Sequence, residues 1–286
     1  MMIHKILWAS DGSKDSIQAL KYAGLLAKEY KAQIFSLLVI PDYYDIAEQF
    51  PAEEKNKFIK WIEETKAKER KALEDIGKDF KEKGINFKIE ITSGIPYREI
   101  LRVADREKVD LIALGKGRAV EKSILGGTAL KVLRSSTLPV LTARGDGKSL
   151  KIKRILVPVD LSHGLSKDLK YAVELSKVFS ATIYLLNVVE VGEYAFPPEI
   201  AEQMRGFSYR EIVESMGKVK IKENIEASVE VAKNAWRGIV GFANERDIDL
   251  IVMMSYGGGK LKEDFIGSVA ERVIQESVCP VITMTP

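Results

Sequence analysis

The feature that most constrains the fold is a long pattern that occurs twice. Residues 5–11 resemble residues 154–160, and residues 100–112 resemble residues 239–251. A repeat of about 140 residues is too long for a solenoid unit and indicates two similar domains. The polar, glycine-bearing stretch at residues 144–149 is typical of a linker. We therefore expect one domain at residues 1–147 and a second at residues 148–286.

Each half alternates short apolar runs with amphipathic stretches. In the first half the sequence predicts strands near residues 6–10, 33–40, 87–92, 110–114 and 139–143, with helices near residues 15–31, 51–83, 98–107 and 127–134. This alternation predicts an α/β fold in which each domain is an open parallel five-stranded sheet with helices on both faces. The pattern leaves the strand order open. In such sheets ligands bind at the carboxyl ends of the strands.

Composition excludes several classes of protein. The 286 residues carry 44 basic and 41 acidic side chains, a net charge of +3, which does not favour a nucleic-acid partner. The single cysteine, Cys279, excludes an intramolecular disulfide and fits a reducing compartment. Neither a signal peptide nor an apolar span of membrane length is visible. We expect a cytoplasmic protein without a membrane partner.

A glycine-rich loop follows an apolar strand in both halves and leads into a helix. The second copy holds Gly257, Gly267 and Ser268, and the first holds Gly115, Gly117 and Gly126 followed by Gly127 and Thr128. Glycine lets the backbone approach a ligand, and a helix N-terminus offers free N–H groups to a phosphate. The alternative is a strand-to-helix connection that has glycines but no ligand. No pattern of catalytic residues or of metal ligands is visible.

With these positions in order, the chain resembles the universal stress protein family in its tandem form over nearly its whole length. The resemblance rests on Asp11 and Asp160 at strand ends, the repeated Asp-Leu-Ile strand, the glycine loops and the closing Pro-Val strands. It implies a fold like that of the adenine nucleotide alpha hydrolases and a bound nucleotide, ATP or AMP. Any accompanying Mg²⁺ is expected to be held mainly by the phosphates. The residues that it places at the nucleotide are Asp11, Val39, Gly115, Gly117, Gly126, Gly127 and Thr128 in the first domain, and Pro158, Asp160, Val188, Met254, Gly257, Gly267 and Ser268 in the second.

The family's phosphate motif is Gly-x2-Gly-x9-Gly-Ser/Thr, and both copies depart from it. In the second, Met254 stands at the first glycine position. In the first, Gly126 matches Gly267 if the following helix keeps its register, and the loop is then two residues shorter. An alternative alignment matches Gly127 to Gly267 and moves that helix by one residue. Lys116 in this loop either neutralises phosphate or is solvated.

The resemblance suggests a nucleotide-binding stress-response regulator or sensor with little or no turnover, because no base for an attacking water is evident. Two alternatives remain open: a scaffold of the same fold that acts through protein contacts, and an enzyme like the ATP pyrophosphatases. The closing strands near residues 140–143 and 281–284 are expected to pair antiparallel within one chain, forming an internal pseudo-dimer. Two chains are expected to form a homodimer.

Overall fold

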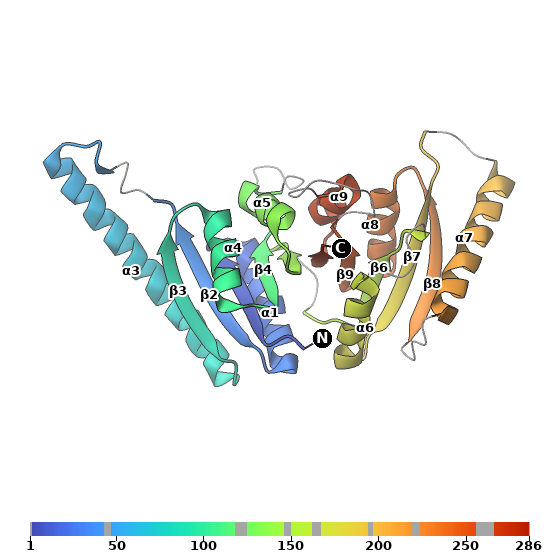
Figure 1. The fold of residues 1–286 in the computed structure, drawn as a ribbon, viewed down its shortest axis with the longest axis horizontal. Helices are drawn as coiled ribbons and strands as arrows, with labels where there is room; N and C mark the ends of the chain where they lie inside the picture. Colours follow the sequence, from blue (N-terminus) through green and yellow to red (C-terminus); the bar gives the residue numbers. More distant parts are fainter. Residues whose placement is uncertain are drawn as a thin grey trace.

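The structure is a computed structural model that describes residues 2–42, 47–117, 125–145, 150–161, 167–193, 197–218, 224–255 and 266–285. The two halves of the chain lie side by side along the longest axis of the molecule (Figure 1). Each half contains five strands, and the parallel five-stranded sheet predicted for each domain is confirmed.

The first half contains β1 (Lys5–Ser10), α1 (Lys14–Tyr30), β2 (Gln33–Ile40), α3 (Ala52–Glu82), β3 (Phe87–Ser93), α4 (Pro96–Glu107), β4 (Leu111–Gly115), α5 (Gly127–Ser135) and β5 (Val140–Ala143). The second half contains β6 (Arg154–Pro158), α6 (Lys167–Phe179), β7 (Thr182–Glu190), α7 (Pro198–Lys218), β8 (Ile225–Ala232), α8 (Ala235–Glu245), β9 (Leu250–Met254), α9 (Ser268–Glu276) and β10 (Val281–Met284). The bounds of the first half agree with the sequence prediction to within a few residues. No helix in the described ranges is long and apolar enough to cross a membrane.

The strands form one ten-stranded sheet in the order β3-β2-β1-β4-β5-β10-β9-β6-β7-β8. One face is covered by α1, α3, α6 and α7, and the other by α4, α5, α8 and α9, each over its own buried apolar cluster. The chain reverses its direction of winding between β1 and β4. In open α/β sheets a ligand crevice is expected at this kind of switch point, outside the carboxyl ends of the strands.

The repeated Asp-Leu-Ile sequence has a structural reason. The carboxylate of Asp110 accepts hydrogen bonds from the backbone N–H groups of His4 and Lys5, at 2.7 and 2.9 Å. Asp249 accepts the equivalent bonds from Lys153 and Arg154, at 2.9 and 3.0 Å. Each aspartate therefore ties the start of β4 or β9 to the start of β1 or β6, where the backbone would otherwise lack partners.

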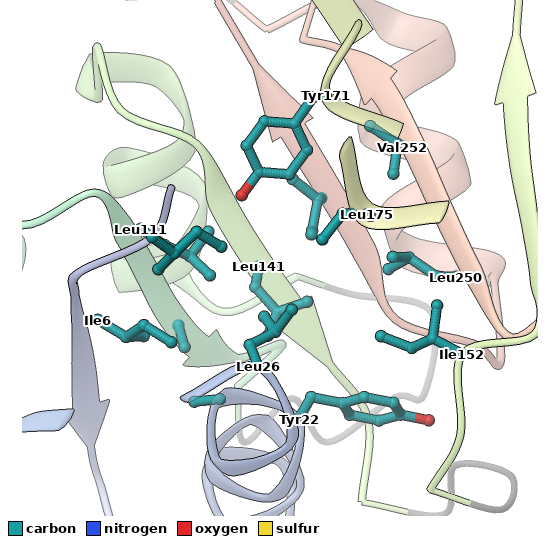
Figure 2. Close-up of a cluster of buried hydrophobic side chains, with 14 of the residues drawn as sticks. Ile6, Tyr22, Leu26, Leu111, Leu141, Ile152, Tyr171, Leu175, Leu250 and Val252 are labelled. Carbon is teal, nitrogen blue, oxygen red and sulfur yellow. The ribbon is translucent and has the colours of Figure 1, made fainter. Parts of the chain in front are cut away.

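The two domains meet through the closing strands, as predicted. β10 pairs antiparallel with β5, with Ile282 opposite Leu141. The buried cluster on the face of α1 and α6 runs through this junction, and Figure 2 shows Leu26 and Leu141 of the first half close to Ile152 and Leu250 of the second. The two domains therefore share one core.

Candidate functional site

A cavity of about 470 Å³ lies at the switch point of the first domain, a size typical of small-molecule sites. It gathers the ends of β1, β2 and β4 and the starts of α4 and α5. All seven residues predicted for this site line it: Asp11, Val39, Gly115, Gly117, Gly126, Gly127 and Thr128. Residues separated by more than 100 positions in the sequence thus converge on one hollow.

The sequence analysis missed the apolar wall of this cavity. Pro96 and Ile100 of α4 contribute to it, together with Leu125 of the loop before α5. Ile100 is also buried in the core cluster on that face of the sheet. Proline at the first helical position was an available signal, because it places the start of α4 at the carboxyl edge of the sheet. The cavity combines an apolar side with the backbone-rich start of α5.

The glycines of the loop have different structural roles. Gly117 has a φ of +104°, and a Cβ there would lie 2.8 Å from the Cα of Gly126. The N–H of Gly126 donates to the carbonyl of Lys116 at 2.7 Å, which closes the loop. In contrast, a Cβ on Gly127 would meet no atom of the described residues within 4 Å. Gly117 and Gly126 therefore bring two backbone segments into contact, and Gly127 faces open space in the cavity.

The start of α5 is suited to an anion. Its N-cap is Gly126, no side chain caps it, and its first turn carries no acidic residue. The first N–H groups of a helix lack intrahelical partners and carry the positive end of the helix dipole. Gly127 and Thr128, the first two residues of α5, are exposed. A phosphate placed here would meet backbone donors with no competing carboxylate in that turn.

Asp11 follows the last residue of β1 and is exposed. Its Oδ1 accepts a hydrogen bond from the N–H of Ser13 at 2.9 Å. The cap of α1 is Ser13, whose Oγ accepts from the N–H of Ser16 at 3.1 Å. Ser13, and not Asp11, is therefore the N-cap of α1, and the turn before the helix positions the Asp11 carboxylate at the cavity.

Packing also requires a glycine at position 115. A Cβ at this position would lie 2.5 Å from the backbone nitrogen of Ser16 and 2.7 Å from the carbonyl carbon of Asp15. Glycine is thus required for α1 to approach the end of β4, independently of any ligand. In the second domain Met254 holds the equivalent place at the end of β9, and the residues equivalent to Asp15 and Ser16 lie outside the described ranges.

The second domain reproduces the register of the loop. The N–H of Gly267 donates to the carbonyl of Ser255 at 2.7 Å, as Gly126 does to Lys116, and Gly267 is the N-cap of α9. The alignment of Gly126 with Gly267 is therefore confirmed, and the one that shifts the helix by a residue is wrong. Ser268 is exposed at the start of α9, as Gly127 is in α5.

The other residues predicted for the second site lie on several separate elements. Pro158 ends β6, and Asp160 is exposed two residues later. Val188 lies against α8, because a Cβ on Gly238 would be 2.7 Å from one of its methyl carbons. Gly257 lies outside the described residues. The structure thus brings the first predicted set together in one cavity, whereas the loop of the second site is described only up to Ser255 and again from Ile266.

Comparison with known proteins agrees with this architecture. The model of the universal stress protein family matches the chain twice, over residues 2–144 and 151–284. The chain belongs to the universal stress protein family. It carries two copies of the family's domain, as expected from the repeat.

Two universal stress proteins show the extent of the similarity. Universal stress protein MJ0577 of Methanocaldococcus jannaschii is 34% identical over 163 residues, which cover 50% of this chain and 96% of that protein. A universal stress protein structure from Archaeoglobus fulgidus covers 98% of both chains with a TM-score of 0.71 at 23% identity, which supports the tandem fold.

A third structure carries a ligand. It is a universal stress protein of Archaeoglobus fulgidus in complex with dAMP, and it is 23% identical over 46% of this chain and 96% of its own, with a TM-score of 0.31. The family thus includes a nucleotide complex, but at this TM-score the likeness does not assign a ligand to this chain.

Lys116 has a role that neither sequence interpretation anticipated. Its side chain is 3% exposed, and its Nζ donates to the carbonyl and to the Oγ of Ser277, at 2.7 and 3.1 Å. Ser277 follows α9 of the second domain. The interpretation of Lys116 as solvated is therefore wrong, and its ammonium is directed to the second domain instead of to a phosphate.

Proposed function

We propose that this universal stress protein binds an adenine nucleotide, ATP or AMP, in the cavity of its first domain and acts as a nucleotide-responsive regulator. The observation that carries the proposal is the convergence of Asp11, Val39 and the glycine loop on one cavity at the switch point of the sheet. This is the arrangement that the family's motif requires, assembled from separate segments of the chain.

Each part of the cavity has a place in the proposal. Val39, Pro96 and Ile100 offer an apolar wall for a base, and Asp11 offers a carboxylate for hydroxyl or amino donors. The start of α5 offers backbone N–H groups to the phosphates. Mg²⁺, if present, would be held mainly by the phosphates, since Asp11 is the only ionisable side chain among the described lining residues.

The residues that line the cavity favour nucleotide binding without rapid turnover. A hydrolase needs a base within hydrogen-bond reach of the attacking water. Asp11 follows β1, whereas the proposed phosphate position is at the start of α5, and the remaining described lining residues are apolar residues, glycines, Ser10 and Thr128. We expect the nucleotide to be held and sensed. In this proposal the second site, around Ser268, binds the same class of ligand more weakly because Met254 replaces glycine.

The experiment that tests this function is mass spectrometry of the small molecules that denaturation releases from the purified protein. AMP, ADP or ATP should be released in amounts that approach the protein concentration. If the protein releases no nucleotide and, after exhaustive dialysis, also fails to retain added ATP or AMP, the scaffold alternative is favoured. Release of pyrophosphate from ATP on the scale of ordinary enzymes, roughly 1–1,000 turnovers per second, would instead favour the enzyme.

A further inference from the structure

The buried ammonium of Lys116 is the starting point, because a charge is costly to bury unless it is well hydrogen-bonded. Lys116 belongs to the loop after β4, yet its Nζ reaches the carbonyl and hydroxyl oxygens of Ser277 in the other domain. Ser277 is the C-cap of α9. The carbonyls at a helix C-terminus carry the negative end of the dipole, so a cation there is stabilising.

The last turn of α9 receives its cations from the first domain. α9 itself has no basic residue in that turn. Besides Lys116, the guanidinium of Arg144, which follows β5, donates to the carbonyl of Gln275. Arg134 of α5 also pairs with Glu271 of α9 at 3.5 Å. Figure 1 shows α5 and α9 beside each other at the centre of the molecule. Three side chains of the first domain, those of Lys116, Arg144 and Arg134, thus contact α9 or its C-cap.

The second domain has no lysine at the position equivalent to Lys116. Ser255 takes the place of Lys116 in the second domain, since its carbonyl accepts from Gly267 as that of Lys116 does from Gly126. The hydroxyl of Ser255 is buried and has no hydrogen-bond partner in the described part of the chain. Within the described residues, the connection between a glycine loop and the opposite domain therefore runs from the first domain to the second.

Lys116 also shapes the cavity of its own domain. It stands between Gly115 and Gly117, which both line that cavity, and its carbonyl receives the N–H of Gly126. Any displacement of the Lys116 backbone would move the segment that supports the start of α5. The side chain and the carbonyl of one residue thus join α9 of the second domain to the phosphate end of the first cavity.

We propose that Lys116 is a positioning residue through which the second domain holds the phosphate end of the first-domain nucleotide site in its binding geometry. This inference rests on the proposed function. The site is then a property of the tandem chain, since the contact that fixes its loop comes from the other repeat.

The test compares Lys116→Met, which keeps the stem and removes the ammonium, with Lys116→Arg, which keeps a cationic donor. Lys21→Met, at an exposed position on α1, serves as the control for loss of one positive charge. All three are made in a Ser268→Asp background, so that the second site does not contribute. Titration calorimetry measures affinity for Mg-ATP and for adenosine, and hydrogen exchange follows amides 114–117 and 126 without ligand.

If Lys116 positions the phosphate end, Lys116→Met should bind Mg-ATP about tenfold or more weakly, a loss typical of removing a supporting contact behind a binding group. Adenosine, which lacks phosphate, should bind with unchanged affinity, and Lys116→Arg should recover part of the lost ATP affinity. Equal loss for ATP and adenosine would indicate a general structural defect and overturn the proposal, as would unchanged ATP affinity.

If the parent protein binds neither ligand, the proposed function fails, and hydrogen exchange decides the inference on the loop. Faster exchange of amides 114–117 and 126 in Lys116→Met, but not in Lys21→Met, would support the anchoring role. Exchange rates equal to those of the parent would overturn it.

Discussion

Leu141→Ala should show that the two domains unfold as one unit. Leu141 is 1% exposed at the centre of β5, opposite Ile282 of β10, and it packs in the core cluster that both domains share. The change removes three carbon atoms, worth about 0.8 kcal/mol each, and leaves a cavity between two paired strands. We expect a loss of about 3–4 kcal/mol, within the range for buried leucine to alanine changes.

Differential scanning calorimetry should record one transition, displaced by roughly 5–7 °C for a chain of this size. Ile212→Ala, at a buried position of α7 far from the junction, should displace the same transition. Ile95→Ala, at a position 49% exposed, should leave it nearly unmoved. Two separate transitions in the parent, or a Leu141→Ala effect confined to one of two transitions, would refute the shared core.

Two further predictions concern alkaline pH and the second site. Burial raises the pKa of Tyr22 to about 12, with smaller contributions from Cys279 and Asp249. Because the pKa of Tyr22 in the folded protein lies above the ordinary value of 10, its contribution to the free energy of unfolding is fully present below pH 10 and is lost as pH rises through 12. In urea titrations over this pH range, the free energy of unfolding should therefore fall less in Tyr22→Phe than in the parent. Met254→Gly should increase ATP affinity at the second site if the side chain obstructs the ligand, measured by calorimetry in a Gly127→Asp background, and unchanged affinity would remove that explanation.

Much of the fold could be predicted because it rests on local pattern. The apolar strands and the single long helix that became α3 follow directly from periodicity, and the internal repeat predicted two domains. The strand order could not be read in this way, because it depends on which non-local edges pair. The pairing of β5 with β10 was nevertheless predicted, since bare apolar edges need a cover and the linker is short.

The candidate site was predicted as a set of residues and not as a shape. The glycine positions and Asp11 were visible in the sequence, and Pro96 marked the start of α4, but Ile100 and Leu125 could not be assigned to the wall because nothing local distinguishes them from ordinary core. The contact of Lys116 with the second domain was even harder to predict. A lysine between glycines is usually solvated, and its partner Ser277 is 161 residues away.

The most direct test of the central claim is calorimetric titration of Mg-ATP and of AMP into the parent protein and into Gly127→Asp. A Cβ at Gly127 would meet no atom of the described residues within 4 Å, so the substitution should leave their fold unstrained and place a carboxylate where the phosphates are proposed to bind. Gly127→Ala provides the uncharged control. We predict binding to the parent, nearly equal binding to Gly127→Ala, and loss of the first-domain component in Gly127→Asp with an unchanged unfolding temperature. Binding of the same strength and stoichiometry in Gly127→Asp, or no binding to the parent, would contradict the assignment of this cavity as a nucleotide site.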